Sequence, residues 1–231
     1  MPTTPADWPA TRQSRLMVPF ARVLMTLFAR FHAAGTEHIP DPPFILASNH
    51  LSYYDIPAFH LVMPYGTVGF AARKYRGTWR EPLFRLNAII WITQFSADRD
   101  ALRAAQRVLA DGTYHMGIAP EGTRSRTGGL QPGTSGAAYL ATRAGVPVLP
   151  GAVWGTEHMF KRLRPRVVVR LGPPLHFPQG RAKGDELDAY TEQIMCAIAA
   201  LLPDQYHGVY AGNPLIDQFR GAGEQAQTTA R

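Results

Sequence analysis

Short apolar runs alternate with amphipathic stretches along most of the chain. Runs with strand character lie at residues 44–48, 67–72, 88–93, 114–119, 147–153 and 166–171. Helical periodicity separates several of them, most clearly over residues 54–63, 97–110, 135–143 and 185–202. Because buried strands that alternate with helices are typical of α/β proteins, we predict an α/β sheet with helices on its faces.

Residues 14–34 form a strongly amphipathic segment. At 100° per residue, Arg15, Arg22, Thr26 and Arg30 fall in one narrow sector of a helix. The opposite arc is apolar and holds Phe20, Val23, Leu24, Leu27, Phe28 and Phe31. This pattern predicts a helix that lies in a membrane interface, but a helix packed on the protein's own core has the same pattern. Both interpretations stay open. We expect three regions: residues 1–34 with this helix, a main domain at 35–205, and a partly disordered C-terminal extension at 206–231.

Charge and composition narrow the class of partner. The 231 residues include 24 Lys and Arg against 17 Asp and Glu, which gives a net charge of +7. An Arg-rich surface suits phosphate groups on nucleic acid, on a phospholipid surface or on a substrate. The basic residues are scattered and are not interleaved with aromatic residues, which argues against nucleic acid. The chain has a single cysteine, Cys196, which excludes an internal disulfide. It contains no run of about 18 uncharged apolar residues, so we do not expect a membrane-spanning helix.

His50 follows the predicted strand at 44–48, and Asp55 lies five residues further on. The carboxyl ends of strands are where α/β sheets bind ligands. Five positions along a regular helix set two side chains about 140° apart, so the two residues meet only if His50 lies in the turn before the helix. In that case Asp55 fixes the imidazole tautomer and leaves the other nitrogen as a base. The alternative is a strand-end histidine that caps backbone groups, with Asp55 in the first turn of a helix.

A second polar segment, residues 119–126, follows the predicted strand at 114–119. Arg124 offers a bidentate fork for a phosphate, and Glu121 offers a carboxylate for a hydroxyl group. The alternative is a solvated polar turn. No sequence motif for a nicotinamide, ATP, zinc-protease or serine-hydrolase site is present.

The two segments together resemble motifs of the glycerolipid acyltransferase family. The pattern NHxSxxD is matched at residues 49–55 and PEGTRS at residues 120–125, about 65 residues later. Residues 146–155 and 172–175 are similar to the family as well, so the resemblance covers about residues 40–205. It implies a mixed sheet flanked by helices. It also implies acyl transfer from acyl-CoA or acyl carrier protein to the hydroxyl of 1-acylglycerol-3-phosphate, giving phosphatidic acid, with His50 as general base and Asp55 orienting it.

The resemblance further implies a substrate site without a metal, a resident cofactor or an acyl-enzyme. Its residues are expected to be Asn49, Ser52, Glu121, Gly122, Thr123, Arg124, Arg73 and Lys74. The partners are then the acyl donor, a lysophospholipid acceptor and a membrane surface, with no nucleic acid. The protein is expected to lie peripherally on the cytoplasmic side of the membrane.

Two positions depart from the family pattern. Thr93 stands where the family's second motif carries Arg, and Ser135 lies in a stretch where a cation often occurs. We expect Arg73, Lys74 and Arg76 to supply the missing charge. The departures leave another lysolipid or a non-phosphate alcohol as alternative acceptors. A non-catalytic, basic membrane-binding protein is the alternative from a different class.

Overall fold

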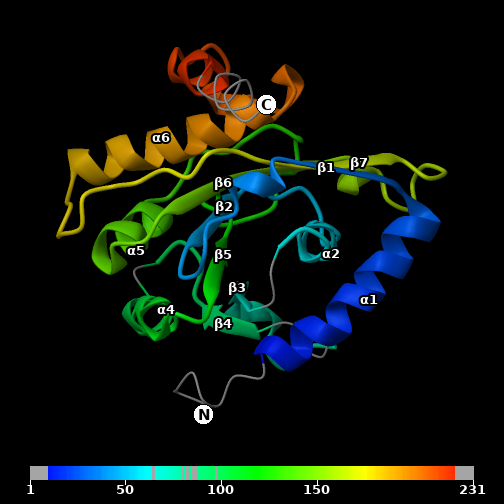
Figure 1. Ribbon diagram of the computed structural model, residues 1–231, viewed down its shortest axis with the longest axis horizontal. Coiled ribbons are helices and arrows are strands. Elements are labelled where there is room, and N and C mark those ends of the chain that lie inside the picture. The colour runs from blue at the N-terminus through cyan, green and yellow to red at the C-terminus, as the bar shows by residue number, and fades with distance from the viewer. Residues whose placement is uncertain are drawn as a thin grey trace.

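The structure, a computed structural model, describes residues 10–63, 66–79, 81, 84, 88–96 and 98–221, with only the backbone of residues 10–16. Within these residues, seven strands form one sheet in the order β1-β7-β6-β2-β5-β3-β4 (Figure 1). The strands are β1 (Arg30–Ala34), β2 (Ile45–Ser48), β3 (Thr67–Ala72), β4 (Ala88–Ile92), β5 (His115–Ile118), β6 (Val148–Trp154) and β7 (Arg166–Leu171). Strand β7 is antiparallel to β6, and every other pair is parallel. The mixed sheet is therefore confirmed.

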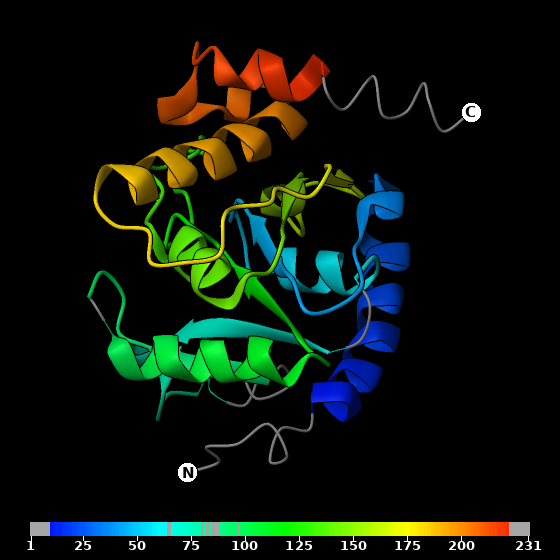
Figure 2. The ribbon, with the colours of Figure 1, turned by 60° about the vertical axis from the view of Figure 1, so that its left-hand side comes forward.

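Helices cover both faces of the sheet (Figures 1 and 2). They are α1 (Ala10–Phe28), α2 (Asp55–His60), α4 (Arg99–Asp111), α5 (Gly136–Ala144) and α6 (Asp185–Leu201). Short 3₁₀ helices lie at Thr36–His38, Arg73–Tyr75, Thr156–His158, Asp204–Tyr206 and Gly208–Tyr210. Side chains alternate between the faces as strand geometry requires: Leu46 packs with α1 and α2, whereas Ile45 and Ala47 pack with α4, α5 and α6.

The first helix is shorter than the sequence predicts. It ends at Phe28, and residues 30–34 form the edge strand β1, so this part of the helix prediction is wrong. The cause is long-range backbone pairing: β1 pairs with β7 from Arg30↔Arg166 onward, and the Arg30 N–H donates to Pro165 O (2.9 Å). Residues 30–34 therefore belong to the sheet, and the expected boundary at residue 34 does not separate the first region from it.

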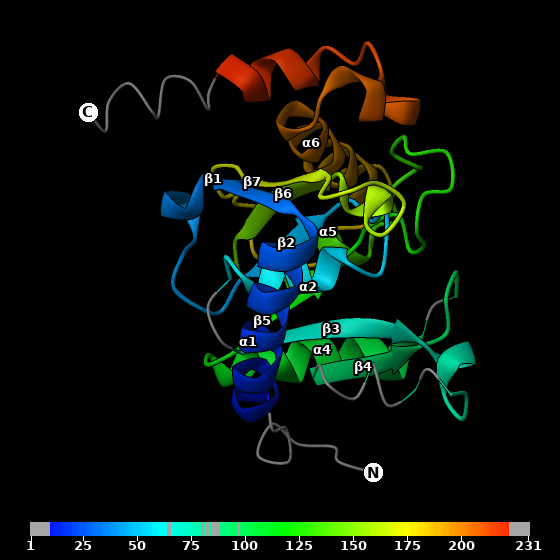
Figure 3. The same ribbon diagram turned by 90° about the vertical axis from the view of Figure 1, so that its right-hand side faces the viewer.

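Helix α1 has two apolar faces with different surroundings. Met17, Ala21, Met25 and Ala29 are buried, as expected for a helix packed on the core. A neighbouring strip made of Phe20, Val23, Leu27 and Phe28 remains exposed on the outside of the molecule, where α1 lies in Figure 3. The buried face confirms packing on the core, whereas the membrane-interface interpretation of the exposed strip stays a prediction. Among the helices that the structure describes, none combines the length and the apolar character needed to cross a membrane.

The C-terminal segment packs on the main domain as far as it is described. Residues 215–221 are helical, and Tyr206 and Ile216 are buried in the same cluster as α6. The described part of the extension expected at 206–231 is therefore ordered. The fraying expected from residue 224 lies outside the described residues.

Candidate active site

The candidate site lies where β2 and β5 end. These neighbouring parallel strands lead into the segments that begin at Asn49 and Ala119, so the two loops emerge side by side. The Ser125 N–H donates to His50 O (2.8 Å), which joins the loops directly. The sheet thus brings together the two polar segments found in the sequence.

His50 and Asp55 meet as the spacing argument requires. Helix α2 begins at Asp55, His50 lies in the turn before it, and His50 Nδ1 is 2.7 Å from Asp55 Oδ2. The carboxylate is buried, whereas the imidazole side chain is 25% exposed. With the Nδ1 hydrogen donated to an ionised Asp55, Nε2 keeps its lone pair on the other side of the ring. The arrangement can therefore take up a proton from a molecule in solvent.

Asp55 is held by donors from two parts of the chain. Its Oδ2 also accepts from the backbone N–H groups of Leu51 (2.7 Å) and Ser52 (2.8 Å), which closes the turn. Its Oδ1 accepts from the Thr156 hydroxyl, 101 residues away in sequence. The preceding residue, Gly155, has a φ of 86°, and any Cβ there would collide with the carbonyl of Arg166. Glycine therefore allows the turn that brings Thr156 to Asp55.

Glu121 lies inside the protein and contacts backbone groups. Its Oε1 accepts from the His50 N–H (2.9 Å), and its Oε2 accepts from the Gln131 N–H (2.8 Å). Burial of the 2%-exposed residue raises the carboxyl pKa to about 6, and the two backbone hydrogen bonds oppose that rise. Each oxygen of Glu121 thus accepts one backbone hydrogen bond, and the carboxylate holds the backbone of His50. Its contact with an acceptor hydroxyl stays a prediction.

Asn49 and Ser52 also contact the chain itself. The buried Asn49 amide donates to Val153 O (2.7 Å) and accepts from the Val153 N–H (2.8 Å), which fastens the end of β2 to β6. The Ser52 hydroxyl oxygen accepts from the Tyr54 N–H (3.0 Å). The polar atoms of these two residues therefore shape the turn that carries His50.

Arg124 lies on the ring of Tyr53, in the turn that carries His50. Its guanidinium carbon is 3.8 Å from the centre of the Tyr53 ring, and its Nη2 donates to Tyr53 Oη (3.1 Å). A hydrogen bond with Tyr53 lowers the pKa of Tyr75, and the charges of Lys74 and Arg124 lower it further. Lys74 and Arg124 therefore both lie near the Tyr75 hydroxyl.

Arg73 has a different partner. Its Nη2 lies 3.2 Å from Asp98 Oδ2, and the same oxygen accepts from the Thr93 N–H (3.0 Å). The backbone hydrogen bond from Thr93 is the main reason that the pKa of Asp98 is lowered, and Arg73 adds to it. Of the cations expected to compensate for Thr93, Arg73 is paired with Asp98, and Lys74 lies over the Tyr75 ring (5.4 Å).

The loop at Gly122 and Thr123 is partly covered by an exposed aromatic residue. Gly122 has a φ of 67°, and a Cβ there would lie 3.3 Å from the Phe95 ring. Phe95 is itself a non-glycine residue with positive φ, and its neighbour Gln94 donates to Gly122 O. Thr123 is exposed in the loop. Sequence reasoning did not find Phe95, because nothing in its own segment links it to Gly122.

Comparison with known proteins identifies the family. The model of the family described as Acyltransferase matches residues 30–154. This stretch includes the turn with His50 and Asp55 and the loop with Glu121 and Arg124. The chain belongs to the acyltransferase family.

Several relatives of this acyltransferase carry the same description. A 1-acyl-sn-glycerol-3-phosphate acyltransferase of Escherichia coli K12 is 33% identical over 165 residues, which cover 65% of this chain and 64% of the relative. One from Limnanthes douglasii is 28% identical over 179 residues, covering 73% and 62%. The crystal structure of the 1-acyl-sn-glycerophosphate acyltransferase PlsC from Thermotoga maritima matches with a TM-score of 0.62 and 29% identity, covering 78% of this chain and 76% of PlsC.

The match is partial in length. This acyltransferase spans 62% of the Limnanthes douglasii relative and 59% of the one from Limnanthes alba. The family match ends at Trp154, two residues before Thr156. A signal for Thr156 did exist in the sequence, since it directly follows the apolar run that becomes β6 and the glycine at 155. The contact of Thr156 with Asp55 could not be predicted, because the sequence pattern does not show that β6 lies next to β2.

Proposed function

We propose that this acyltransferase moves a fatty acyl group from acyl-CoA or acyl carrier protein to the free hydroxyl of 1-acylglycerol-3-phosphate. The observation that carries the proposal is the His50–Asp55 pair, with Nδ1 and Oδ2 2.7 Å apart at the carboxyl end of β2. The names of the relatives support the choice of acceptor.

In the proposed reaction His50 acts as a general base. Its Nε2 takes the proton of the acceptor hydroxyl while that oxygen forms a bond to the thioester carbonyl carbon. The bond from carbon to sulfur then breaks, and the leaving thiolate receives the proton from the imidazolium. Asp55 stabilises the imidazolium between these steps without becoming protonated. The products are phosphatidic acid and the free thiol of the carrier, and the scheme uses no resident cofactor.

His50→Ala tests the base directly. General-base catalysis contributes about 10²–10⁴-fold, so turnover should fall by at least that range while circular dichroism stays unchanged. Asp55→Asn should be severe too, on the order of 10⁴-fold as in Ser-His-Asp triads, because the wrong tautomer is then favoured. His32→Ala, at an exposed histidine on β1, is the matched control and should keep full activity. A folded His50→Ala protein with near wild-type turnover would remove His50 as the base.

Arg124 and Lys74 are proposed to hold the acceptor phosphate. Loss of a charge-assisted hydrogen bond costs about 1.5–3 kcal/mol, so Arg124→Ala should raise the KM for a phosphate-bearing acceptor by about 10- to 150-fold. The KM for the acyl thioester should change much less. Steady-state kinetics with each substrate varied separately measures both values, and equal effects on the two substrates would contradict a phosphate role.

A different acceptor is the second candidate, and one observation favours it. Thr93 replaces the cation of the family pattern, and Arg73 is occupied by Asp98. A panel of lysolipids, with and without a phosphate, tested with acyl-CoA and acyl carrier protein donors decides between the acceptors. Transfer to a phosphate-free alcohol at a higher kcat/KM than to 1-acylglycerol-3-phosphate would favour the second candidate.

We further propose that the protein lies peripherally on the cytoplasmic side of a membrane. The exposed strip of α1 supports this location, since Phe20, Val23 and Leu27 are all more than half exposed. A surface of this kind is stabilised when it enters the acyl boundary of a bilayer.

A further inference from the structure

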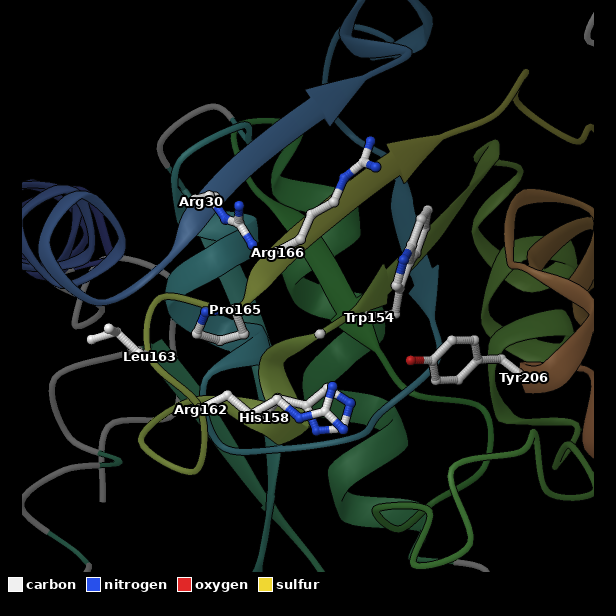
Figure 4. Close-up of a pocket in the computed structure, with 9 residues that line it drawn as sticks. Arg30, Trp154, His158, Arg162, Leu163, Pro165, Arg166 and Tyr206 are labelled. Carbon is white, nitrogen blue, oxygen red and sulfur yellow. The ribbon is translucent and has the colours of Figure 1, made fainter.

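A hollow of about 340 Å³ lies at the same edge of the sheet as the candidate site, around the start of β1 and β7. Arg30 and Arg166 stand on neighbouring strands, with Arg162 and His158 across the opening on the connection from β6 to β7 (Figure 4). We name this hollow the cationic basin and define it by Arg30, Arg162 and Arg166. Within the described part of the chain, no carboxylate lies within ion-pair distance of these three guanidinium groups.

One carboxylate lies near the basin and is partly occupied. Glu157 Oε1 accepts a hydrogen bond from Tyr206 Oη (2.8 Å) and lies 3.5 Å from His158 Nε2, whereas its buried Oε2 has no hydrogen-bond partner among the described residues. The basin therefore keeps a net positive charge from its arginines. In Figure 4 the Arg166 head points away from Arg162, so the arginines surround the hollow without converging on one point. Guanidinium groups without carboxylate partners, spread around one hollow, match the charge of a phosphate-bearing surface, and each can bind one phosphate through its fork.

An apolar rim borders the basin on the side of α1. Leu163 is 95% exposed and lies toward α1 in Figure 4, while Trp154 and Tyr206 lie on the opposite side. Phe160, on the same connection, is half exposed, and its ring lies 4.9 Å from that of Phe28. The rim thus continues the exposed strip of α1.

The connection between β6 and β7 is fastened to the end of α1. Arg164 Nη2 donates to Thr26 O (3.1 Å) and Ala29 O (3.4 Å), and Arg30 Nε donates back to Arg164 O (3.2 Å). Both Phe160 and Arg164 adopt positive φ values, of 62° and 45°, which these contacts hold in place. The apolar rim and the cationic basin are therefore fixed relative to the exposed strip of α1.

We propose that the cationic basin binds the phosphate headgroup of an anionic phospholipid while Leu163, Phe160 and the exposed strip of α1 enter the bilayer beside it. The proposal rests on the proposed attachment of α1 to a membrane. Apolar side chains next to unpaired guanidinium groups match the boundary between acyl chains and headgroups. The basin is lined by Gly155 but not by His50 or Asp55, so we assign to it a bound lipid other than the reacting one.

Vesicle co-sedimentation of the full chain tests the basin. The double variant Arg162→Gln with Arg166→Gln leaves Arg30, and with it the fastening to Arg164, intact. Binding to phosphatidylcholine vesicles that contain phosphatidylglycerol should fall about 30-fold, which corresponds to about 2 kcal/mol. Binding to vesicles of phosphatidylcholine alone should fall much less, since that zwitterionic surface has no net negative charge and the apolar strip remains. Arg162→Gln by itself, on the connection and outside the sheet, should lose about 5-fold.

Two further variants separate a headgroup site from general charge. Arg107→Gln with Arg181→Gln removes the same charge from exposed positions on α4 and before α6, and should bind both kinds of vesicle like the wild type. Arg162→Lys with Arg166→Lys keeps the charge but not the fork, so binding to phosphatidylglycerol vesicles should still fall severalfold. Wild-type binding by the lysine pair, or an equal loss in the control pair, would overturn the proposed site.

The phosphates of coenzyme A are the other source of the same chemistry. Isothermal titration calorimetry with coenzyme A should give the same affinity for the wild type and for the Arg162→Gln, Arg166→Gln protein. A loss of coenzyme A affinity with unchanged vesicle binding would overturn the headgroup site. Vesicle binding is read without turnover, so its failure would leave the proposed acyl transfer standing, and absence of acyl transfer would leave the basin standing.

Discussion

Two buried carboxylates hold His50 from different directions. The Asp55 carboxylate is hydrogen-bonded to the imidazole ring, whereas the Glu121 carboxylate accepts a hydrogen bond from the backbone N–H of the same residue. Each carboxylate also bonds other backbone N–H groups of its own loop. The imidazole therefore has its orientation before any substrate arrives, which is the condition for efficient proton transfer at a fixed point.

Glu121→Gln should change how stability depends on pH. The folded-state pKa of Glu121 is raised from 4.5 to about 6, so the folded state holds a proton that the unfolded state releases first. This group's contribution is fully present below about pH 4.5, and the free energy of unfolding falls by about 2 kcal/mol as pH rises to about 6. Urea denaturation of both proteins at several pH values measures it. The free energy of unfolding of the wild type, minus that of Glu121→Gln, should fall between about pH 4.5 and 6. Parallel plots of unfolding free energy against pH for the two proteins would contradict the raised pKa.

At the residue scale, the sequence predicted pairs that are close along the chain and missed those that are not. The five-residue separation of His50 and Asp55 allowed a contact on one condition, that His50 lies in the turn before the helix, and the structure meets that condition. Glu121 and Thr156 reach the same site from 71 and 101 residues away. Those contacts depend on β2 lying between β5 and β6, and strand order is not readable from periodicity.

At the scale of elements, the structure shows which apolar residues of α1 are buried and which are exposed, a distinction that the sequence pattern does not make. A buried face with Met17, Ala21 and Met25 lies beside an exposed strip with Phe20 and Leu27. On a helical projection of the sequence the two merge into one apolar arc, so the pattern predicts a helix but not what each part touches. The end of the helix was missed because the pairing of β1 with β7 overrides local periodicity. By contrast, β3 and β7 occupy the predicted residues, since each is a compact apolar run with clear breakers.

Phe20→Glu with Phe28→Glu should weaken attachment to membranes and leave the fold intact. Both side chains are on the exposed strip, so charges there cost little in water but oppose entry into a bilayer. Vesicle binding should fall at least tenfold for phosphatidylcholine vesicles with or without phosphatidylglycerol, with little change in Tm. Thr26→Glu, on the exposed polar side of α1, is the matched control. Unchanged binding by the folded double variant would rule out the interfacial role.

Deletion of residues 1–33 is a poor substitute for that experiment. It removes most of β1 along with the buried side chains of Met17 and Met25. Losing a buried methionine side chain costs about 2–5 kcal/mol even when the backbone stays. The truncated protein should therefore unfold, and its loss of membrane binding would say nothing about the exposed strip.

At the scale of the whole molecule, the candidate site and the cationic basin share one edge of the sheet. The His50 turn follows β2, the Glu121 loop follows β5, and the basin lies where β6 ends and β7 begins. The exposed strip of α1 borders the same edge through the contact of Phe28 with Phe160. Docking through the strip and the basin would bring the site to the membrane surface, where the proposed lysolipid acceptor would lie.

Salt should separate membrane docking from chemistry. The Debye length shrinks from about 10 Å at 0.1 M to about 3 Å at 1 M, so added salt weakens the attraction of exposed arginines to an anionic surface. Activity toward an acceptor embedded in phosphatidylglycerol-containing vesicles should fall more steeply with sodium chloride than activity toward a short-chain, water-soluble acceptor. The ratio of the two rates, measured from about 0.1 to 1 M salt, would stay constant if the membrane contributed no electrostatic attraction.

The pairing of β1 with β7 also has a consequence for biosynthesis. The hydrogen bond between Arg30 and Arg164 joins residues 134 positions apart, so β1 has no partner strand until β7 leaves the ribosome. At about 5–20 residues per second, that delay is on the order of 10 s. During this time the face of α1 that is buried in the finished fold lacks part of its cover, because β7 and the connection that fastens the helix have not been made. We therefore expect a period during synthesis in which a chaperone or the bilayer can bind α1 before β1 pairs with β7.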